Sequence, residues 1–422
     1  MSFGRRLALI VAAGVLLRVI YLLTIGRDVV GFGDWFFYHW QAGLLADGRG
    51  WLEPYRLREN GAELPSAGHP PLYPLAVSVV ALLGGDSQLA QRFLGVPLGA
   101  ATLVLLGLVG RRIGGERLGL AAAALGAGYP VLIAADGALL SETLFGPLVL
   151  LALLAALRLA ERPGLSRGAL LGAAIALAAL TRAEALLLLP LLALPLAWRA
   201  RSGPAALGAI AAFFLVLAPW TIRNLVQLDT FVPISTNDST VLAGANCPLT
   251  YAGVDMGGWN IECISPRRFA DEAAQARVWR KEATDYAFSH KRRWPAVITV
   301  RVARVWDFWQ PRRQVMFAEG RQRRVVQAGV AVYFGLMVLA AVGLRALWRR
   351  PRPPGTLPVL LVPAGVVCLS AITGYGVPRL RHLFEPGLVL LAAAGVLVLL
   401  DAAVERWPRV RPAWRGAGPE PS

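Results

Sequence analysis

The sequence predicts an all-α integral membrane protein with about ten transmembrane helices, and three observations carry that prediction. Of the 422 residues, 56% are hydrophobic and 16% are charged. The apolar residues come in blocks of roughly 20, the length at which a helix crosses the hydrocarbon core of a bilayer. Short joints that are rich in Arg, or in Pro and Gly, separate these blocks.

The positive charges are distributed unevenly between the joints. The formal net charge is +17, and 18 of the 43 basic residues gather in alternate joints, near residues 5–6, 111–117, 158–167, 199–201, 345–352 and 406–415. The short joints between these hold only Arg182, Arg379 and Arg381. The positive-inside rule therefore places both termini in the cytoplasm and gives an even number of spans. Because topology explains the charge, no nucleic-acid partner is expected.

The positions of the spans follow from the apolar blocks and the alternation of charge. We expect them at about 7–24, 89–110, 118–133, 138–158, 168–181, 184–198, 205–220, 325–344, 356–372 and 383–400. No small-residue cleavage site follows the first span, so we expect it to be retained rather than removed as a signal peptide. The apolar run at 70–84 is too short to span comfortably and is expected to be re-entrant or interfacial.

These spans divide the chain into three parts. Residues 1–220 form an N-terminal transmembrane module whose first external loop, 25–87, begins an aromatic helix at Asp34 that suits the membrane interface. Residues 221–324 contain no convincing span and form an extracytoplasmic segment of mixed structure with interfacial helices. Residues 325–422 form a C-terminal transmembrane module and a cytoplasmic tail.

Two carboxylates on the external side are candidate catalytic groups. Asp34 precedes the aromatic helix, where it acts either as a simple N-cap or as a functional group. Glu142 lies near the outer end of a span among apolar neighbours. Ionisable groups at membrane depth are costly and usually face a cavity or a partner, although a hydrogen bond to a neighbouring helix would also explain Glu142. Both carboxylates are expected on the same side, where they line one cavity.

The other polar groups expected on that side are mostly cationic. Arginine forks at a water–lipid boundary suit a phosphate, whereas the simpler interpretation is that they extend to the interface or bind any anionic headgroup. Phosphate-binding groups beside a carboxylate indicate transfer from a lipid phosphate to a hydroxyl, with the carboxylate as general base. The group consists of His69, Arg182 with its neighbour Glu184, Arg223, Arg379 and Arg381.

Cysteine usage adds one covalent expectation. Cys247 and Cys263 both lie in the extracytoplasmic segment, where oxidation is permitted, so we expect a disulfide between them. No His lies near them at ligand spacing, which argues against a zinc site.

At this point the chain resembles the family-39 branch of the GT-C glycosyltransferases, which includes protein O-mannosyltransferases and the lipid A aminoarabinose transferase. The resemblance lies in the order of short motifs, which are Arg18 and Tyr21, Gly33-Asp34, Tyr38, Gly48 and Gly50, Pro70 to Pro74, Arg92, Ser141-Glu142, Pro219-Trp220, Arg223-Asn224, Ile234 to Asn237, and Arg379 with Arg381. It covers most of the chain. It implies a polyprenyl-phosphate-linked sugar as donor and inverting transfer on the extracytoplasmic side of the cell membrane.

The resemblance also implies roles for individual residues. Asp34 is the general base and Glu142 takes the place of the second acidic residue of the family. The donor phosphate is expected at His69, Arg223, Arg379 and Arg381, although His is weaker than Lys or Arg for this at neutral pH. The acceptor cavity is expected to be lined by Tyr38, Tyr73, Arg182 and Glu184. No cofactor is expected, and a reaction without metal is favoured over one that uses a divalent ion between the carboxylates.

Two other functions stay open. A transporter or flippase of a lipid-linked glycan would show internal repeats and polar residues at mid-membrane, whereas the charges here lie at the outer ends of spans. A ligase or polymerase that moves an oligosaccharide from a lipid pyrophosphate would share the chemistry and differ in the size of its donor. The acceptor class, whether glycan, lipid or protein of the cell envelope, is also open.

Overall fold

The computed structural model describes residues 1–27, 33–265, 272–316, 318–349 and 351–406. Within these ranges the elements are all helical, and no β-strand is present. Seven helical segments of the described chain are long and apolar enough to cross a membrane. Two more apolar helices are shorter, α4 (Leu72–Leu82) and α9 (Leu165–Ala179). The chain is therefore an all-α multi-pass membrane protein, which confirms the predicted fold class.

Helix α6 (Gly95–Gly128) is a hairpin of two packed arms, and it lies beside α1 (Phe3–Leu23). Its backbone leaves helical geometry at Gly114-Gly115, where Gly115 has a φ of +80°. A Cβ atom on Gly119 would come within 2.4 Å of the Gly107 carbonyl oxygen. Glycine thus supplies both the left-handed turn and the close contact between the arms. The arms correspond to the expected spans at 89–110 and 118–133, and the second is continued by α7 (Pro130–Asp136).

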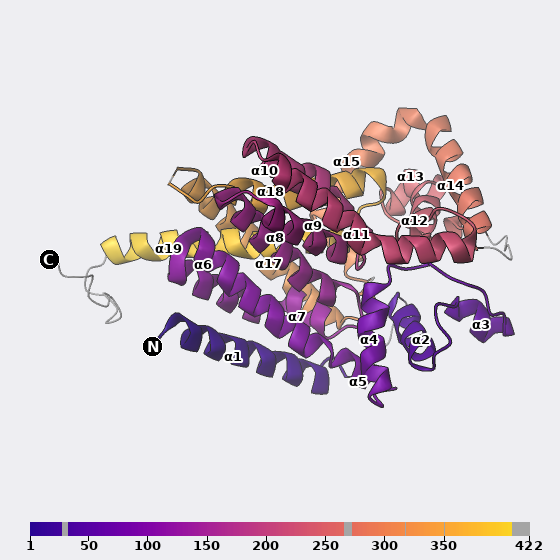
Figure 1. The fold of residues 1–422 in the computed structure, drawn as a ribbon, viewed down its shortest axis with the longest axis horizontal. Coiled ribbons are helices and arrows are strands. Elements are labelled where there is room, and N and C mark those ends of the chain that lie inside the picture. Colours follow the sequence, from indigo (N-terminus) through magenta and orange to yellow (C-terminus); the bar gives the residue numbers. More distant parts are fainter. Residues whose placement is uncertain (28–32, 266–271, 317, 350, 407–422) are drawn as a thin grey trace.

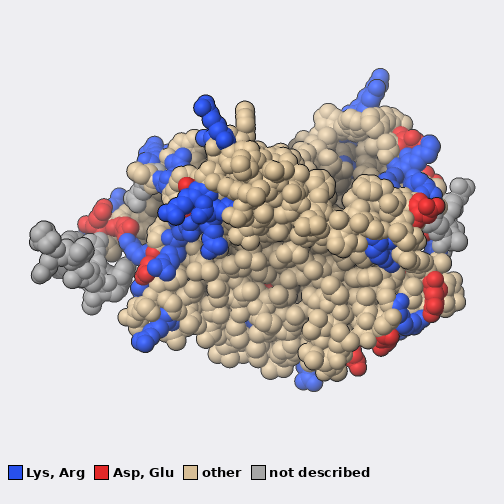
Figure 2. Space-filling view, viewed as in Figure 1, with Lys and Arg blue, Asp and Glu red and all other residues tan. Residues whose placement is uncertain are grey.

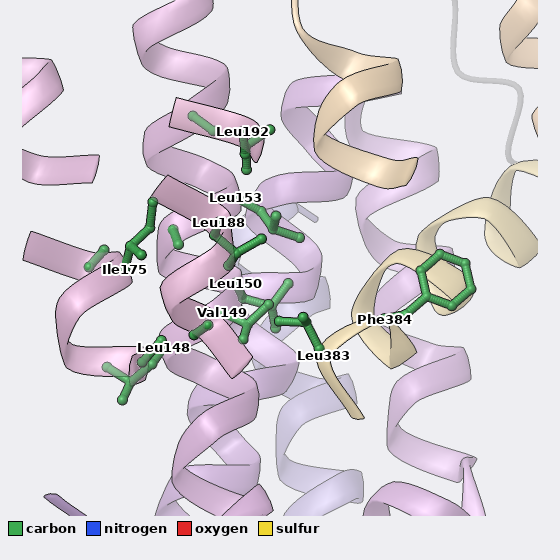
Figure 3. Packing of buried hydrophobic residues seen from close by; sticks show 14 of the residues in the cluster. Leu148, Val149, Leu150, Leu153, Ile175, Leu188, Leu192, Leu383 and Phe384 are labelled. Atoms are coloured by element: carbon green, nitrogen blue, oxygen red, sulfur yellow. The ribbon is translucent and has the colours of Figure 1, made fainter. Parts of the chain in front are cut away.

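Helix α8 (Glu142–Glu161) is the central helix of the bundle, with more of its surface buried than any other apolar helix described as long enough to span. Leu150 and Leu153 on α8 belong to the same buried cluster as Ile175 on α9 and Leu188, part of which Figure 3 shows. The expected span at 184–198 is broken into η1 (Ala183–Leu187), η2 (Leu189–Ala193) and α10 (Leu194–Arg199). Two prolines, Pro190 and Pro195, explain the irregularity, because each removes a backbone donor from the helical ladder. Helix α11 (Gly203–Leu228) completes this half.

The C-terminal helices pack closely on one another through glycine. A Cβ atom on Gly343 of α17 (Arg323–Arg349) would lie 1.9 Å from the Leu391 carbonyl oxygen of α19 (Glu385–Arg406). Small residues at such a contact let two helix backbones approach, which is how helices associate within lipid. Between them in the chain lie α18 (Thr356–Thr373) and the short turn η6 (Pro378–Leu383).

The remaining helices gather at one end of the bundle, which we call the loop end. In Figure 1 this end lies opposite the beginning of α1 and the end of α19. Charged side chains gather towards the two ends of the molecule, and the middle of the face in Figure 2 carries almost none. The loop end contains α2 (Trp35–Ala46), α3 (Pro54–Asn60), α4, α5 (Gln88–Arg92), α12 (Asn237–Ala245), α13 (Pro248–Tyr251), η3 (Gly253–Asp255), η4 (Ile261–Cys263), α14 (Glu272–Ser289), η5 (Lys291–Arg293), α15 (Trp294–Val305) and α16 (Pro311–Gln314).

Cys247 and Cys263 are joined in a disulfide at the loop end, with Cα atoms 5.8 Å apart, as expected from the sequence. The bridge closes a loop with a sequence separation of 16 residues. Replacing both cysteines by Ser is expected to lower the free energy of unfolding by about 3 kcal/mol, because the unfolded chain regains the closed loop's freedom. Thermal unfolding of the purified protein measures this loss. Cys368→Ser, which removes an unpaired thiol, is the control, and an equal loss in both variants would contradict the prediction.

Candidate active site

Three carboxylates from distant parts of the chain converge on the guanidinium of Arg379. Glu142 accepts two hydrogen bonds from Arg379. Nε donates to Oε1, and Nη2 donates to Oε2 at 3.2 Å. Asp34 accepts from Nη1 at 3.0 Å, and Glu319 accepts from the same nitrogen. Asp34 makes no side-chain cap bond to α2, so its carboxylate serves the cluster and not the helix. The structure thus brings together three of the predicted site residues and adds a fourth.

The local backbone explains how each carboxylate reaches Arg379. Asp34 and Glu142 stand at the beginnings of α2 and α8, so both side chains project from helix ends at the loop end of the bundle. Glu319 has a φ of +48°, a left-handed conformation that a non-glycine residue adopts at a cost. A Cβ atom on Gly33 would lie 3.3 Å from the Glu319 Cβ, so glycine beside Asp34 leaves room for the Glu319 loop.

The carboxylates differ in how far they are exposed. The side chains of Arg379 and Glu142 are 8% and 4% exposed, whereas those of Asp34 and Glu319 are 36% and 24% exposed. Burial acts to raise the pKa of the Asp34 carboxyl, but the Arg379 guanidinium and His69 outweigh it and hold that pKa below its usual value. Burial raises the pKa of Glu319 above its usual value despite Arg379. Asp34 is therefore the most exposed carboxylate of the cluster, and its surroundings favour its ionised form.

A second guanidinium supports the buried side of the cluster. Arg182 lies 3.1 Å from Glu142 and 2.7 Å from its neighbour Glu184. Glu142 therefore lies between two guanidinium groups, a geometry that stabilises its ionised form and fixes its position.

Aromatic rings pack beside Asp34. The ring of His69 lies 4.3 Å from Phe37 and 5.3 Å from Tyr38, and Tyr38 meets Tyr73 edge-on at 4.9 Å. Burial lowers the pKa of His69, although the Asp34 carboxylate opposes this. A neutral imidazole is a weak partner for a phosphate, in keeping with the reservation drawn from the sequence.

Asp34, Glu319 and Arg379 open into a cavity of about 520 Å³ at the loop end. Its walls come from the loop around α3, from α12 and from α14. They combine carboxylates with aromatic rings, namely Glu53, Glu59 and Glu272 with Phe37, Tyr55, Trp259, Trp279 and Tyr375. His69 and Arg56 also line the cavity. This mixture suits a polyhydroxylated ligand, since carboxylates accept hydroxyl donors and rings pack on its apolar face.

Two of the predicted phosphate-binding residues lie elsewhere and make structural contacts. Arg223 donates to the carbonyl oxygens of Ser66 at 2.7 Å and Trp51 at 3.0 Å, and so holds the first loop onto α11. Arg381 is buried, bonded to Glu385 at 2.7 Å and Asp307 at 2.8 Å, with Tyr333 under its guanidinium. The sequence predicted the end of the bundle at which both lie, but not the direction in which the side chains point.

The sequence analysis missed Glu319 and the cavity wall on α14. Glu272, at the start of α14, accepts from the Ala67 backbone at 3.0 Å and from the Thr236 hydroxyl at 2.6 Å. These contacts join the first loop to the segment between α11 and α17. Glu319 lies in the run Ala318-Glu-Gly-Arg321, where a glycine just before an apolar span was the available signal for a turn.

Among the described residues, no group of three or more His, Cys, Asp and Glu side chains is arranged to hold a metal ion. The three carboxylates nearest each other instead surround the positive charge of Arg379.

Comparison with known proteins supports the fold. The sequence pattern of the dolichyl-phosphate-mannose-protein mannosyltransferase family matches residues 68–222, which is less than half of the chain. No curated protein sequence matches the chain.

Among solved structures, the oligosaccharyltransferase of Archaeoglobus fulgidus in complex with Zn and sulfate is similar at a TM-score of 0.55 and 15% identity, over 94% of this chain and 50% of that one. The apo form of the same enzyme is similar at a TM-score of 0.54 and 14% identity, over 96% of this chain and 52% of that one. The chain thus spans about half the length of that enzyme. ArnT from Cupriavidus metallidurans bound to undecaprenyl phosphate has a lower TM-score of 0.45 at 13% identity, over 97% of this chain and 81% of that one. The chain has the GT-C fold expected from the sequence.

Proposed function

We propose that the protein is an inverting glycosyltransferase that moves a sugar from a polyprenyl-phosphate donor to an acceptor of the cell envelope. The observation that carries this proposal is the Asp34 carboxylate, which is open to the cavity and held 3.0 Å from Arg379 next to Glu142. An ionised carboxylate beside a guanidinium supplies the two groups that transfer from a phosphate to a hydroxyl requires. The family pattern at 68–222 and the GT-C fold support the same conclusion.

In the proposed reaction, Asp34 accepts the proton of the acceptor hydroxyl while the oxygen of that hydroxyl attacks the anomeric carbon of the donor sugar. The bond from that carbon to the phosphate oxygen breaks, the phosphate keeps the electron pair, and the anomeric configuration inverts. Arg379 contacts Asp34 and is placed to stabilise the negative charge on the departing phosphate. Glu142 and Arg182 fix the orientation of Arg379 from the buried side.

The proposed location is the cell membrane, with both termini in the cytoplasm and the cavity on the extracytoplasmic side. The charge distribution supports this orientation, because arginines gather in the joints expected to be cytoplasmic. The beginning of α1 and the end of α19 lie at the same end of the bundle, as an even number of crossings requires (Figure 1).

Removal of divalent metal ions is expected to leave the transfer rate unchanged to within about twofold, because Arg379 supplies the positive charge at the point where the carboxylates meet. The measurement is the rate of sugar transfer after treatment with EDTA and dialysis, with and without added Mn²⁺ or Mg²⁺. A large loss that either ion restores would contradict this prediction.

The function itself is tested with the purified protein in liposomes that contain a polyprenyl phosphate carrying a radiolabelled hexose or pentose. We expect the label to move to a fraction of envelope acceptors while free polyprenyl phosphate accumulates in step. Movement of the intact donor across the bilayer without chemical change would identify a flippase instead. Transfer that occurs only from an oligosaccharide on a lipid pyrophosphate would identify a ligase.

A further inference from the structure

The hydrogen-bonding capacity of Arg379 is almost used up by carboxylates. A guanidinium has five N–H groups, and the Arg379 contacts with Glu142, Asp34 and Glu319 engage all three of its nitrogens. A phosphate binds arginine best through two parallel N–H groups on one edge. In this structure the edge formed by Nε and Nη2 belongs to Glu142, and Nη1 donates to both Asp34 and Glu319. A lipid phosphate therefore cannot dock on Arg379 through two parallel N–H groups unless one carboxylate leaves.

The three carboxylates are not equally able to leave. Glu142 is 4% exposed and is held by two guanidinium groups, those of Arg379 and Arg182. Glu319 is 24% exposed, lines the cavity and shares a single nitrogen with Asp34. Its backbone lies in a left-handed conformation, and Gly320 follows with a φ of +78°. A partly exposed carboxylate on a strained turn is displaced by an incoming anion at a lower cost than the buried, doubly held Glu142.

The balance of charge around Arg379 also favours displacement of Glu319. Four carboxylates face three guanidinium groups there, namely Asp34, Glu142, Glu184 and Glu319 against Arg182, Arg321 and Arg379. A phosphate that entered without any rearrangement would add to a net negative site. Withdrawal of Glu319 from Nη1 frees a donor and moves one negative charge away from the place where the phosphate docks.

We propose that Glu319 occupies on Arg379 the place that the donor phosphate takes, so that donor binding displaces Glu319. This inference rests on the proposed function, since it names the residue that competes with the donor at that site. Glu319 then acts as a selectivity element, because a ligand without an anionic group has no means to displace it. Asp34 keeps its own hydrogen bond from Nη1, so displacement of Glu319 leaves the proposed general base in place.

The test is the affinity of the full-length protein, in detergent, for a polyprenyl monophosphate that carries no sugar. Glu319→Gln keeps the shape of the side chain and removes its charge. It is expected to bind the lipid about three- to tenfold more tightly than the wild type, which corresponds to the loss of one competing ion pair. Glu319→Ala is expected to shift affinity in the same direction. Glu59→Gln is the matched control, because Glu59 lines the same cavity but is not among the carboxylates that hold Arg379.

The outcomes separate this inference from the proposed function. Equal or weaker binding by both Glu319 variants, with normal binding by the wild type, would overturn the inference and leave the function standing. An equal gain in Glu59→Gln would show a general effect of charge and would also overturn it. Failure of the wild type and all variants to bind the lipid would overturn the proposed donor class and the inference with it.

Discussion

Asp34→Asn is expected to abolish sugar transfer and to leave folding and membrane insertion intact. An amide has nearly the shape of the carboxylate and keeps an oxygen that accepts from Arg379, but it cannot take the proton of an acceptor hydroxyl. Loss of a general base lowers a rate by roughly 10²- to 10⁴-fold. The measurement is the initial rate of label transfer, together with the thermal unfolding temperature of the same preparation.

Asp47→Asn is the control for that variant. Asp47 caps the other end of α2 and is exposed, so its amide variant makes the same chemical change on the same helix away from Arg379. Its transfer rate is expected to match the wild type. Full activity in Asp34→Asn would remove the base from the proposed mechanism, whichever result the control gave.

Arg379→Gln is expected to lower both activity and stability. The variant leaves Glu142 buried with half of its positive partners, and it leaves Asp34 and Glu319 facing one another without the charge between them. Breaking a buried ion pair by removing one partner costs about 3–5 kcal/mol. We therefore expect a clear fall in the unfolding temperature, and a transfer rate below about 1% of the wild-type rate in the fraction that remains folded.

The matched control is Arg280→Gln. Arg280 forms an equally forked ion pair with Asp238, but both side chains are substantially exposed, and such pairs contribute at most about 1 kcal/mol. A loss of stability in Arg379→Gln no larger than in this control would show that the cluster is a surface feature. It would also contradict the conclusion that the buried ion pairs of Arg379 stabilise the protein.

The sequence allowed the fold class and part of the site to be predicted, for identifiable physical reasons. Apolar block length and arginine alternation report on membrane crossing directly, so the bundle followed from composition and order. Asp34, Glu142 and Arg379 were predictable because each places a charge near the end of a span. An ionisable group at that depth is costly and usually faces a cavity or a partner.

The sequence did not indicate the direction in which each charged side chain points. Arg379 and Arg381 lie two residues apart in η6, and both were expected to bind phosphate. One points to the cavity, and the other is buried against Glu385 and Asp307. The difference depends on a short 3-10 turn that packs against α15 and α19. Helix α19 follows the turn directly, but Asp307, the other partner of Arg381, lies 74 residues earlier in the chain. Glu319 was missed for the related reason that nothing in its local sequence indicates the partner it meets.

The buried ion pairs of Arg381 fix the position of the turn η6. Through Asp307 this arginine is tied to the segment that carries α15, and through Glu385 to the first turn of α19. Arg379 lies two residues earlier on the same turn, so the ion pairs of Arg381 also restrain the position of the Arg379 guanidinium. A shift of α15 relative to α19 would therefore also displace the guanidinium that holds Asp34 and Glu142.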